Sequence, residues 1–279
     1  MDKETIIKKA LEEDIGSGDH SSLACIPTDA VGKMELLVKV DEGIIAGVEV
    51  AKEIFKQVDP SIKMTTYKND GDTVHRGDIV FTIEGPTISM LTAERNVLNF
   101  MQRMSGIATT THQYMQRIAG TGARLLDTRK TTPNMRVFEK MAVKIGGGTN
   151  HRFGLYDMIM LKDNHIDFAG GIEKAIDVTH QYLKEKNLDL KIEVETRSID
   201  DVRRVVKHGG VQRIMFDNFT PDQIREALPI VPEEIETEAS GGITYDNIRD
   251  YAETGVDFIS VGALTHQIKS LDLSLKAKK

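Results

Sequence analysis

Apolar residues in the second half of the chain recur in short runs, and the segments between them have helical spacing. Stripes such as Ile224, Ala227 and Leu228 fall on one helix face, and Ser198 and Thr220 are typical N-caps. The runs with the length and apolar content of buried strands span residues 124–128, 158–162, 191–196, 213–218, 234–240 and 258–263. Strand followed by helix, repeated, predicts a parallel sheet, either a closed or nearly closed βα barrel or a doubly wound open sheet.

The first part of the chain has a different pattern, which predicts a small α+β unit. Its expected elements are a helix at 3–13, a strand pair at 33–46, a helix at 48–58, two strand-like runs around 69–72, a strand at 78–84 and a long helix at 88–120. The sequence DGDTVHRGD in this part resembles the hairpin of biotinyl and lipoyl carrier modules. No lysine stands at its turn to carry a cofactor, so a structural hairpin is expected.

Composition narrows the class of protein. The 279 residues carry a net charge of −7 and include one cysteine, which excludes an intrachain disulfide and favours a reducing compartment. The first residues lack the apolar core of a signal peptide, and no apolar run reaches membrane-spanning length, so a cytoplasmic protein without a membrane partner is expected. A sequence pI near 5.7 and the absence of Trp argue against a nucleic-acid surface.

A basic island lies within this acidic chain. Residues 127–165 hold seven Lys or Arg residues and four acids, a local excess of three positive charges. Because a solvated face normally mixes the two signs, such an island predicts an anion-binding site.

Polar residues and glycines follow all six predicted strands, at the edge where parallel sheets bind ligands. Ser240, Gly241, Gly242 and Gly262 are typical of a phosphate cradle, because glycine lets the backbone N–H groups approach an anion. Glu195 and Asp217 can hold Mg²⁺ or stabilise a developing cation. The cations that can grip carboxylates or a second phosphate are Arg129, Lys130, Arg152 and Lys162.

The segment 146–152 begins with three glycines and predicts a flexible loop that delivers His151 and Arg152 to the same edge. Taken together, the residues predict an enzyme that joins a phosphorylated, sugar-like substrate to a carboxylated one.

Seven motifs, in this order and spacing, resemble the quinolinate phosphoribosyltransferase family, the decarboxylating nicotinate-nucleotide pyrophosphorylases. They are DTRKTTP, GGGTNHR, MLKDNHI, EVE, FDN, EASGG and SVGALTH, between Asp127 and His266. The resemblance implies an N-terminal α/β sandwich domain at 1–110, completed by the tail 267–279. It also implies an incomplete six-stranded parallel βα barrel at 111–266. The implied reaction converts quinolinate and phosphoribosyl pyrophosphate to nicotinate mononucleotide, pyrophosphate and CO₂ in NAD biosynthesis, with Mg²⁺ as cofactor.

The resemblance also implies roles for single residues. It places quinolinate's carboxylates among Arg129, His151, Arg152 and Lys162, and Lys130 at phosphoribosyl pyrophosphate. The remaining implied substrate contacts are Arg95, Thr128, Glu195, Asp217, Ser240, Gly241, Gly242, Gly262 and His266. Lys130, Lys162, Glu195 and Asp217 are the implied catalytic residues, and Glu195 and Asp217 would meet Mg²⁺ through substrate or water. Arg95 would enter the neighbouring subunit's site, which makes a homodimer obligatory and leaves a higher oligomer open.

Three other hypotheses remain at this level. A ModD-like paralogue shares the fold and motifs and could use a different acceptor. A Schiff-base aldolase would use Lys162 as its nucleophile, which requires a depressed pKa in an apolar pocket. Neighbouring cations could supply that shift, but so many anion-binding groups would then be surplus. A non-enzymatic carrier module would depend on the hairpin near residues 70–85 alone.

Overall fold

The computed structural model describes residues 2–278, which form two compact units. The first unit comprises the chain up to His112, then Thr131–Gly147 and the chain from Leu264 onward, and the second comprises Gln113–Lys130 and Gly148–Ala263. The sequence analysis placed residues 131–147 in the barrel domain, whereas here they group with the first unit. Within residues 2–278, no helix combines the length and apolar character that a membrane span requires.

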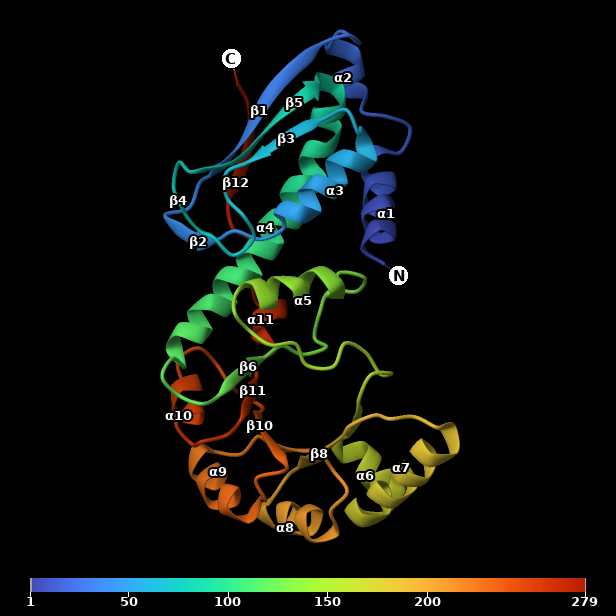
Figure 1. The fold of residues 1–279 in the computed structure, drawn as a ribbon, viewed down its shortest axis with the longest axis vertical. Helices are drawn as coiled ribbons and strands as arrows, with labels where there is room; N and C mark the ends of the chain where they lie inside the picture. The colour runs from blue at the N-terminus through green and yellow to red at the C-terminus, as the bar shows by residue number, and fades with distance from the viewer. Residues whose placement is uncertain (1, 279) are drawn as a thin grey trace. The chain divides into compact units, whose positions relative to one another are not determined.

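The first unit is built on an antiparallel sheet (Figure 1). Its order is β12-β1-β5-β3, from Leu273–Ala277, Val31–Val38, Ile79–Pro86 and Lys63–Thr66. Alternate side chains of β1 are buried: Leu36 lies opposite Phe81 of β5, and Met34 lies opposite Ile83. The C-terminal strand β12 supplies one edge of the sheet by pairing with β1.

Helices cover this sheet and complete the core of the first unit. Phe55 of α3 meets Phe81 edge to face, with ring centroids 6.0 Å apart. Met90 of α4 packs near Gly32 of β1, where a larger residue would crowd the helix. The helices with residues in this unit are α1 (Lys3–Ile15), α2 (His20–Cys25), α3 (Val48–Val58), α4 (Thr87–Arg117), α5 (Arg136–Ile145) and α11 (Ala263–His266).

Strand pairing corrects two predictions for this unit. The expected strand pair at 33–46 forms two strands in different sheets, because β2 (Glu42–Ile44) pairs with β4 (Thr73–His75) and not with β1. The expected hairpin around residues 70–85 is also wrong, because β4 pairs with β2, whereas β5 pairs with β1 and β3. Both corrections have one physical cause: the turns bring the strands close, but burial of the apolar face decides which edges pair.

The second unit contains the predicted parallel sheet of six strands, in the order β6-β11-β10-β9-β8-β7. Every pair in it is parallel, and β6 and β7 form the two edges, so the sheet is an incomplete barrel as predicted. The strands are β6 (Arg124–Leu126), β7 (Ile159–Leu161), β8 (Ile192–Thr196), β9 (Arg213–Asp217), β10 (Glu236–Ser240) and β11 (Phe258–Ser260).

Within the second unit, helices follow β7, β8, β9 and β10, as the sequence predicts (Figure 1). Ser198 caps α8 by accepting the Asp201 N–H, and Thr220 and Gln223 form a capping box on α9 with Pro221 in its first turn. The helices are α6 (Asp163–Ala169), α7 (Ile172–Lys186), α8 (Ile199–His208), α9 (Pro221–Ala227), the short η1 (Leu228–Ile230) and α10 (Ile248–Ala252).

Candidate active site

A cavity of about 520 Å³ lies in the second unit, at the carboxyl ends of the parallel strands. Loops after the strands and the inward side chains of β8 to β11 form its wall. Its lining consists of Thr128, Arg129, Lys130, His151, Arg152, Met160, Lys162, Glu195, Met215, Asp217, Asn218, Glu238, Ser240, Gly241, Gly242 and Ser260. The structure thus brings the predicted cations, acids and phosphate cradle around one space.

Cations occupy one side of this cavity. Arg152 is half-buried and donates from Nη1 to the carbonyl of Met158, at 3.1 Å. Burial, and after it the charge of Arg129, lowers the pKa of Arg152 from its ordinary value. Two guanidinium groups that repel each other in a partly desolvated wall are a favourable place for a dianion.

The segment that carries His151 and Arg152 is fastened to β6. The Thr149 N–H donates to the Leu125 carbonyl at 2.8 Å, and the Asp127 N–H donates to the Thr149 carbonyl at 3.2 Å. The His151 N–H then donates to the buried Asp127 carboxylate, at 2.8 Å. The predicted flexible loop is therefore bonded to the sheet from Thr149 onward, which fixes where Arg152 enters the cavity.

Two carboxylates face each other on neighbouring strands at the cavity wall. Burial raises the pKa of Glu195, and a hydrogen bond with Asp217 and the charge of that residue raise it further, while nearby Lys162 opposes the shift. Lys162 Nζ lies 3.8 Å from Glu195 Oε2, which is buried. Such a pair of adjacent oxygen ligands suits Mg²⁺, so these two residues fit the implied metal.

The phosphate cradle depends on glycine geometry. Gly241 and Gly242 have φ values of 92° and 62°, in the left-handed region that glycine adopts at low cost. A Cβ atom at Gly241 would overlap both the side chain and the backbone nitrogen of Asn218. Asn218 in turn ties the two loops together, because its N–H donates to the Ser240 carbonyl at 2.8 Å.

A buried charged cluster, formed by His151, Glu193, Arg213 and Glu238, lies at the inner end of the cavity. The Nε2 atom of His151 is 3.1 Å from Glu193 Oε2 and 3.3 Å from Glu238 Oε2. Arg213 Nη1 lies 3.1 Å from the same Glu238 oxygen. Both glutamates are fully buried, so each charge in the cluster depends on its neighbours.

Burial and pairing shift the pKa values within this cluster. Burial disfavours a charged His151, whereas the two glutamates favour it, and the Arg152 N–H that Nδ1 accepts at 2.6 Å opposes a second proton on the ring. Burial, and after it the charge of Glu238, raises the pKa of Glu193 to about 7. Burial acts in the same direction on Glu238, yet His151, Ser260 and Arg213 together lower its pKa.

The sequence analysis did not select Glu193, Glu238 or Arg213, although a signal for them exists. Successive side chains of a strand alternate between its faces, so Glu193 must share a face with Glu195, and Glu238 with Ser240. Arg213 shares the inward face with Asp217 in the same way. The period of two therefore identifies the face, while the partners depend on the register between strands.

Three predicted residues stand outside the cavity's described lining. Gly262 follows β11 in the second unit. Arg95 and His266 belong to the first unit. Their expected roles at the substrates stay predictions.

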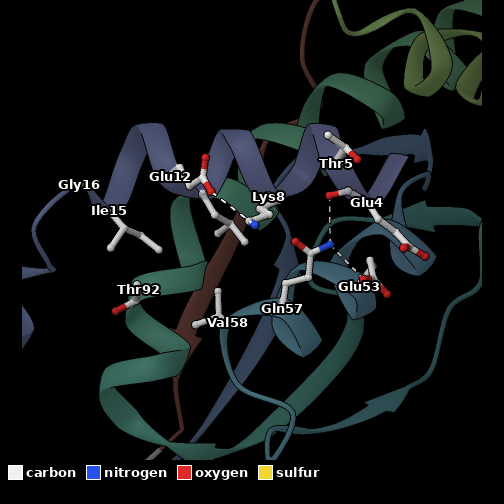
Figure 2. A pocket seen from close by; sticks show the side chains of 11 residues that line it. Glu4, Thr5, Lys8, Glu12, Ile15, Gly16, Glu53, Gln57, Val58 and Thr92 are labelled. Carbon is white, nitrogen blue, oxygen red and sulfur yellow. Dashed lines mark hydrogen bonds and ion pairs between the residues drawn. The ribbon is translucent and has the colours of Figure 1, made fainter. Parts of the chain in front are cut away.

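A larger hollow of about 780 Å³ exists in the first unit, between α1, α3 and Thr92 of α4. Figure 2 shows contacts among its polar side chains: Lys8 pairs with Glu12, and Gln57 donates to Glu53. Its charged lining is mixed and includes no counterpart of the cation group in the second unit. The smaller cavity in the second unit is therefore the better candidate for chemistry.

Comparisons with known proteins agree on one family. The family model for the quinolinate phosphoribosyl transferase C-terminal domain matches residues 107–276, and the model for its N-terminal domain matches residues 19–105. A relative from Nicotiana tabacum, quinolinate phosphoribosyltransferase [decarboxylating] 2b, mitochondrial, is 45% identical over 290 residues, which cover 99% of this chain and 82% of the relative.

Bacterial proteins give the same result. The probable nicotinate-nucleotide pyrophosphorylase [carboxylating] of Bacillus subtilis (strain 168) is 43% identical over 263 residues, covering 94% of this chain and 89% of the relative. The crystal structure of NadC from Streptococcus pyogenes superposes with a TM-score of 0.91 at 38% identity, covering 98% of this chain and 96% of that one.

Proposed function

The chain belongs to the quinolinate phosphoribosyltransferase family, and from that premise we propose that it transfers a phosphoribosyl group from phosphoribosyl pyrophosphate to quinolinate. The products are nicotinate mononucleotide, pyrophosphate and CO₂, a step in NAD biosynthesis. The observation that carries this proposal is the cavity itself, in which cations, facing carboxylates and a glycine cradle surround one space.

Quinolinate carries two neighbouring carboxylates on a pyridine ring, and the cation side of the cavity suits it. Arg129, Arg152 and Lys162 bind the carboxylates, with the two arginines offering planar forks. The side chains of Met160 and Met215 also line the cavity and offer apolar contact to the ring. This arrangement orients the ring nitrogen toward the sugar and holds it there.

The other substrate binds along the remaining wall. The N–H groups of the Ser240 to Gly242 segment receive the 5′-phosphate, and Lys130 neutralises the pyrophosphate. Glu195 and Asp217 lie where positive charge develops on the ribose as pyrophosphate leaves. They would also hold Mg²⁺ through substrate or water, and the metal supplies further charge neutralisation of the leaving group.

The chemistry follows from these placements. The quinolinate nitrogen forms a bond to the anomeric carbon, and the bond to pyrophosphate breaks. The C2 carboxylate then leaves as CO₂, and its bonding electrons remain on C2 beside the positively charged ring nitrogen, which stabilises them. C2 finally takes up a proton, so the residues of the chain mainly bind, align and exclude water.

The aldolase hypothesis is less compatible with the site. Lys162 is half-exposed and lies beside the Glu195 carboxylate, at 3.8 Å, and the other anion-binding groups that line the cavity would be surplus in an aldolase. The carrier hypothesis loses its structural basis because the hairpin near residues 70–85 does not form.

The proposal also includes a role for Arg95 and the assembly of two subunits. We place Arg95, which is exposed on α4, in the site of a partner subunit, and infer a homodimer from that role. A mixture of Arg95→Ala and Lys130→Ala subunits should then regain activity through one intact hybrid site. Absence of recovery after proven subunit exchange would count against a shared site.

We also infer a reducing, cytoplasmic setting from the single cysteine. Some plant relatives are named mitochondrial or chloroplastic, so the compartment varies within the family.

The test of the reaction is the release of labelled CO₂ from quinolinate, with and without phosphoribosyl pyrophosphate and Mg²⁺. Release that requires both, together with nicotinate mononucleotide, supports the proposal. A folded protein that binds phosphoribosyl pyrophosphate but releases no CO₂ would contradict quinolinate as the acceptor and favour the paralogue.

A further inference from the structure

His151 lies at the junction between the buried cluster and the cavity, and its contacts differ from those of a substrate ligand. Only 8% of the residue is exposed, although it contributes to the cavity wall. Its Nε2 atom points toward Glu193 and Glu238, which are buried on β8 and β10. Its Nδ1 atom accepts the N–H of Arg152 at 2.6 Å. Both ring nitrogens are therefore engaged within the protein.

These contacts determine where the ring carries its proton. A nitrogen that accepts an N–H bond has no proton of its own, so in the neutral ring the proton is on Nε2. Two carboxylate oxygens lie 3.1 and 3.3 Å from Nε2, within ion-pair distance, and their negative charge favours a proton on this nitrogen. Arg213 balances their charge from β9, at 3.1 Å from Glu238.

The same three side chains could be read as a metal site, because one ligand atom of each of His151, Glu193 and Glu238 lies within 4.8 Å of the others. A metal at Nε2 would need that nitrogen without its proton, and Nδ1 would then have to carry it. The Arg152 N–H occupies the position of that proton. The geometry therefore places a proton, and not a cation, at the centre of the cluster.

We propose that His151 is a positioning residue: Glu193 and Glu238 fix its Nε2, and its Nδ1 holds the Arg152 backbone so that the guanidinium enters the cavity at a defined place. The His151 N–H, bonded to Asp127 after β6, anchors the same segment at its other end. His151 thus connects β8 and β10, through its imidazole, and the segment after β6, through its N–H, to one substrate-binding arginine, and its ring does not itself bind a carboxylate of the substrate. This inference rests on the proposed function for the identity of that substrate.

The kinetic test changes Glu193, because Glu238, the other carboxylate near Nε2, also pairs with Arg213. Glu193→Leu should raise the KM for quinolinate by roughly tenfold, the size of one weakened charge-assisted hydrogen bond, and leave the KM for phosphoribosyl pyrophosphate within about twofold. Glu193→Gln keeps an oxygen that can accept the Nε2 proton and should restore most of the affinity. Glu236→Gln is the matched control, because Glu236 pairs with Arg213 at 2.9 Å without a contact to His151, and both KM values should stay unchanged.

A spectroscopic test reads the ring directly, by ¹⁵N NMR of the labelled full-length protein, with the His151 signals identified by their loss in His151→Gln. We expect a protonated Nε2 and an Nδ1 without a proton, both before and after saturation with quinolinate. Movement of the proton to Nδ1 when quinolinate binds, or equal changes in both KM values in Glu193→Leu, would overturn the inference. If the wild-type protein does not use quinolinate at all, the proposed function fails, while the tautomer in the free protein still tests the contacts of His151.

Discussion

Glu193 and Glu195 lie two residues apart on one strand and face the same side of the sheet, yet their surroundings are opposite. Glu193 is fully buried and lies 3.1 Å from His151. Glu195 faces the cavity, where its nearest cation, Lys162, lies 3.8 Å away. The inner layer pairs its charges with one another within the protein, whereas the outer layer presents its charges to the cavity.

The two layers differ in function: residues of the outer layer bind the substrates, and residues of the inner layer hold Arg152 in position. Changes in the outer layer should act on the affinity for one substrate, since each side of the cavity suits a different anion. Changes in the inner layer should act on stability and on the placement of Arg152. Substitutions in each layer test this division.

Arg152→Ala should weaken quinolinate binding by about 100-fold, because it removes a charged fork from a partly desolvated wall. Arg152→Lys is the matched variant, which keeps the charge but loses the planar fork and should recover only part of the affinity. Equilibrium titration with quinolinate measures the affinity of both variants. An unchanged affinity in Arg152→Ala would contradict the binding of a quinolinate carboxylate by Arg152.

Lys130→Ala should raise the KM for phosphoribosyl pyrophosphate by roughly 30-fold and leave quinolinate binding nearly unchanged, because a surface lysine contributes as a point charge to a polyanion. Initial rates at varied phosphoribosyl pyrophosphate give this value. Equal losses for both substrates would show that the two sides of the cavity do not act separately.

Gly241→Ala should raise the KM for phosphoribosyl pyrophosphate by about tenfold. The substitution places a Cβ against Asn218 at a φ of 92°, so the loop must move away from the position that receives the phosphate. Gly255→Ala is a control for the backbone cost alone, since Gly255 has a φ of 93° but only an ordinary contact with Leu228. Similar kinetics in the two variants would argue against a phosphate cradle at Gly241.

The inner layer predicts a pH dependence of stability. The pKa of Glu193 is raised from 4.5 to about 7. Between these two values the folded chain holds more protons than the unfolded chain. The stability that this carboxyl contributes at low pH should therefore be lost as the pH rises from about 5 to 7, on the order of 2 kcal/mol.

Urea unfolding at several pH values measures this change, with Glu193→Gln as the comparison. The variant cannot take up the glutamate proton, so its free energy of unfolding should vary less across the same interval. A wild-type protein that becomes more stable as the pH rises would contradict the assignment.

Much of the second unit follows from the sequence. Its apolar runs mark six strands, and the caps at Ser198 and Thr220 depend on residues only three positions apart, so local chemistry is sufficient to place them. The charged residues after the strands identify the binding edge for the same reason. Most of the predicted site residues therefore lie around one cavity.

The pairing of strands within the first unit could not be predicted from the sequence in the same way. The turn at residues 69–72 suggests a hairpin, but β3 pairs with β5 and β4 pairs with β2. A turn signal reports on four residues, whereas strand pairing is decided by the apolar faces that many distant residues bury together.

The alternation of strand and helix in the second unit, the binding edge of the parallel sheet and the family could be predicted from the sequence, because they depend on spacing along the chain. The depth at which each inward side chain lies could not, because it depends on the packing of the whole unit. Glu193 and Glu195 have the same residue type, face and strand, and they differ because His151 arrives from a distant segment to meet one of them. Such a contact depends on the register of several strands at once, which no local pattern records.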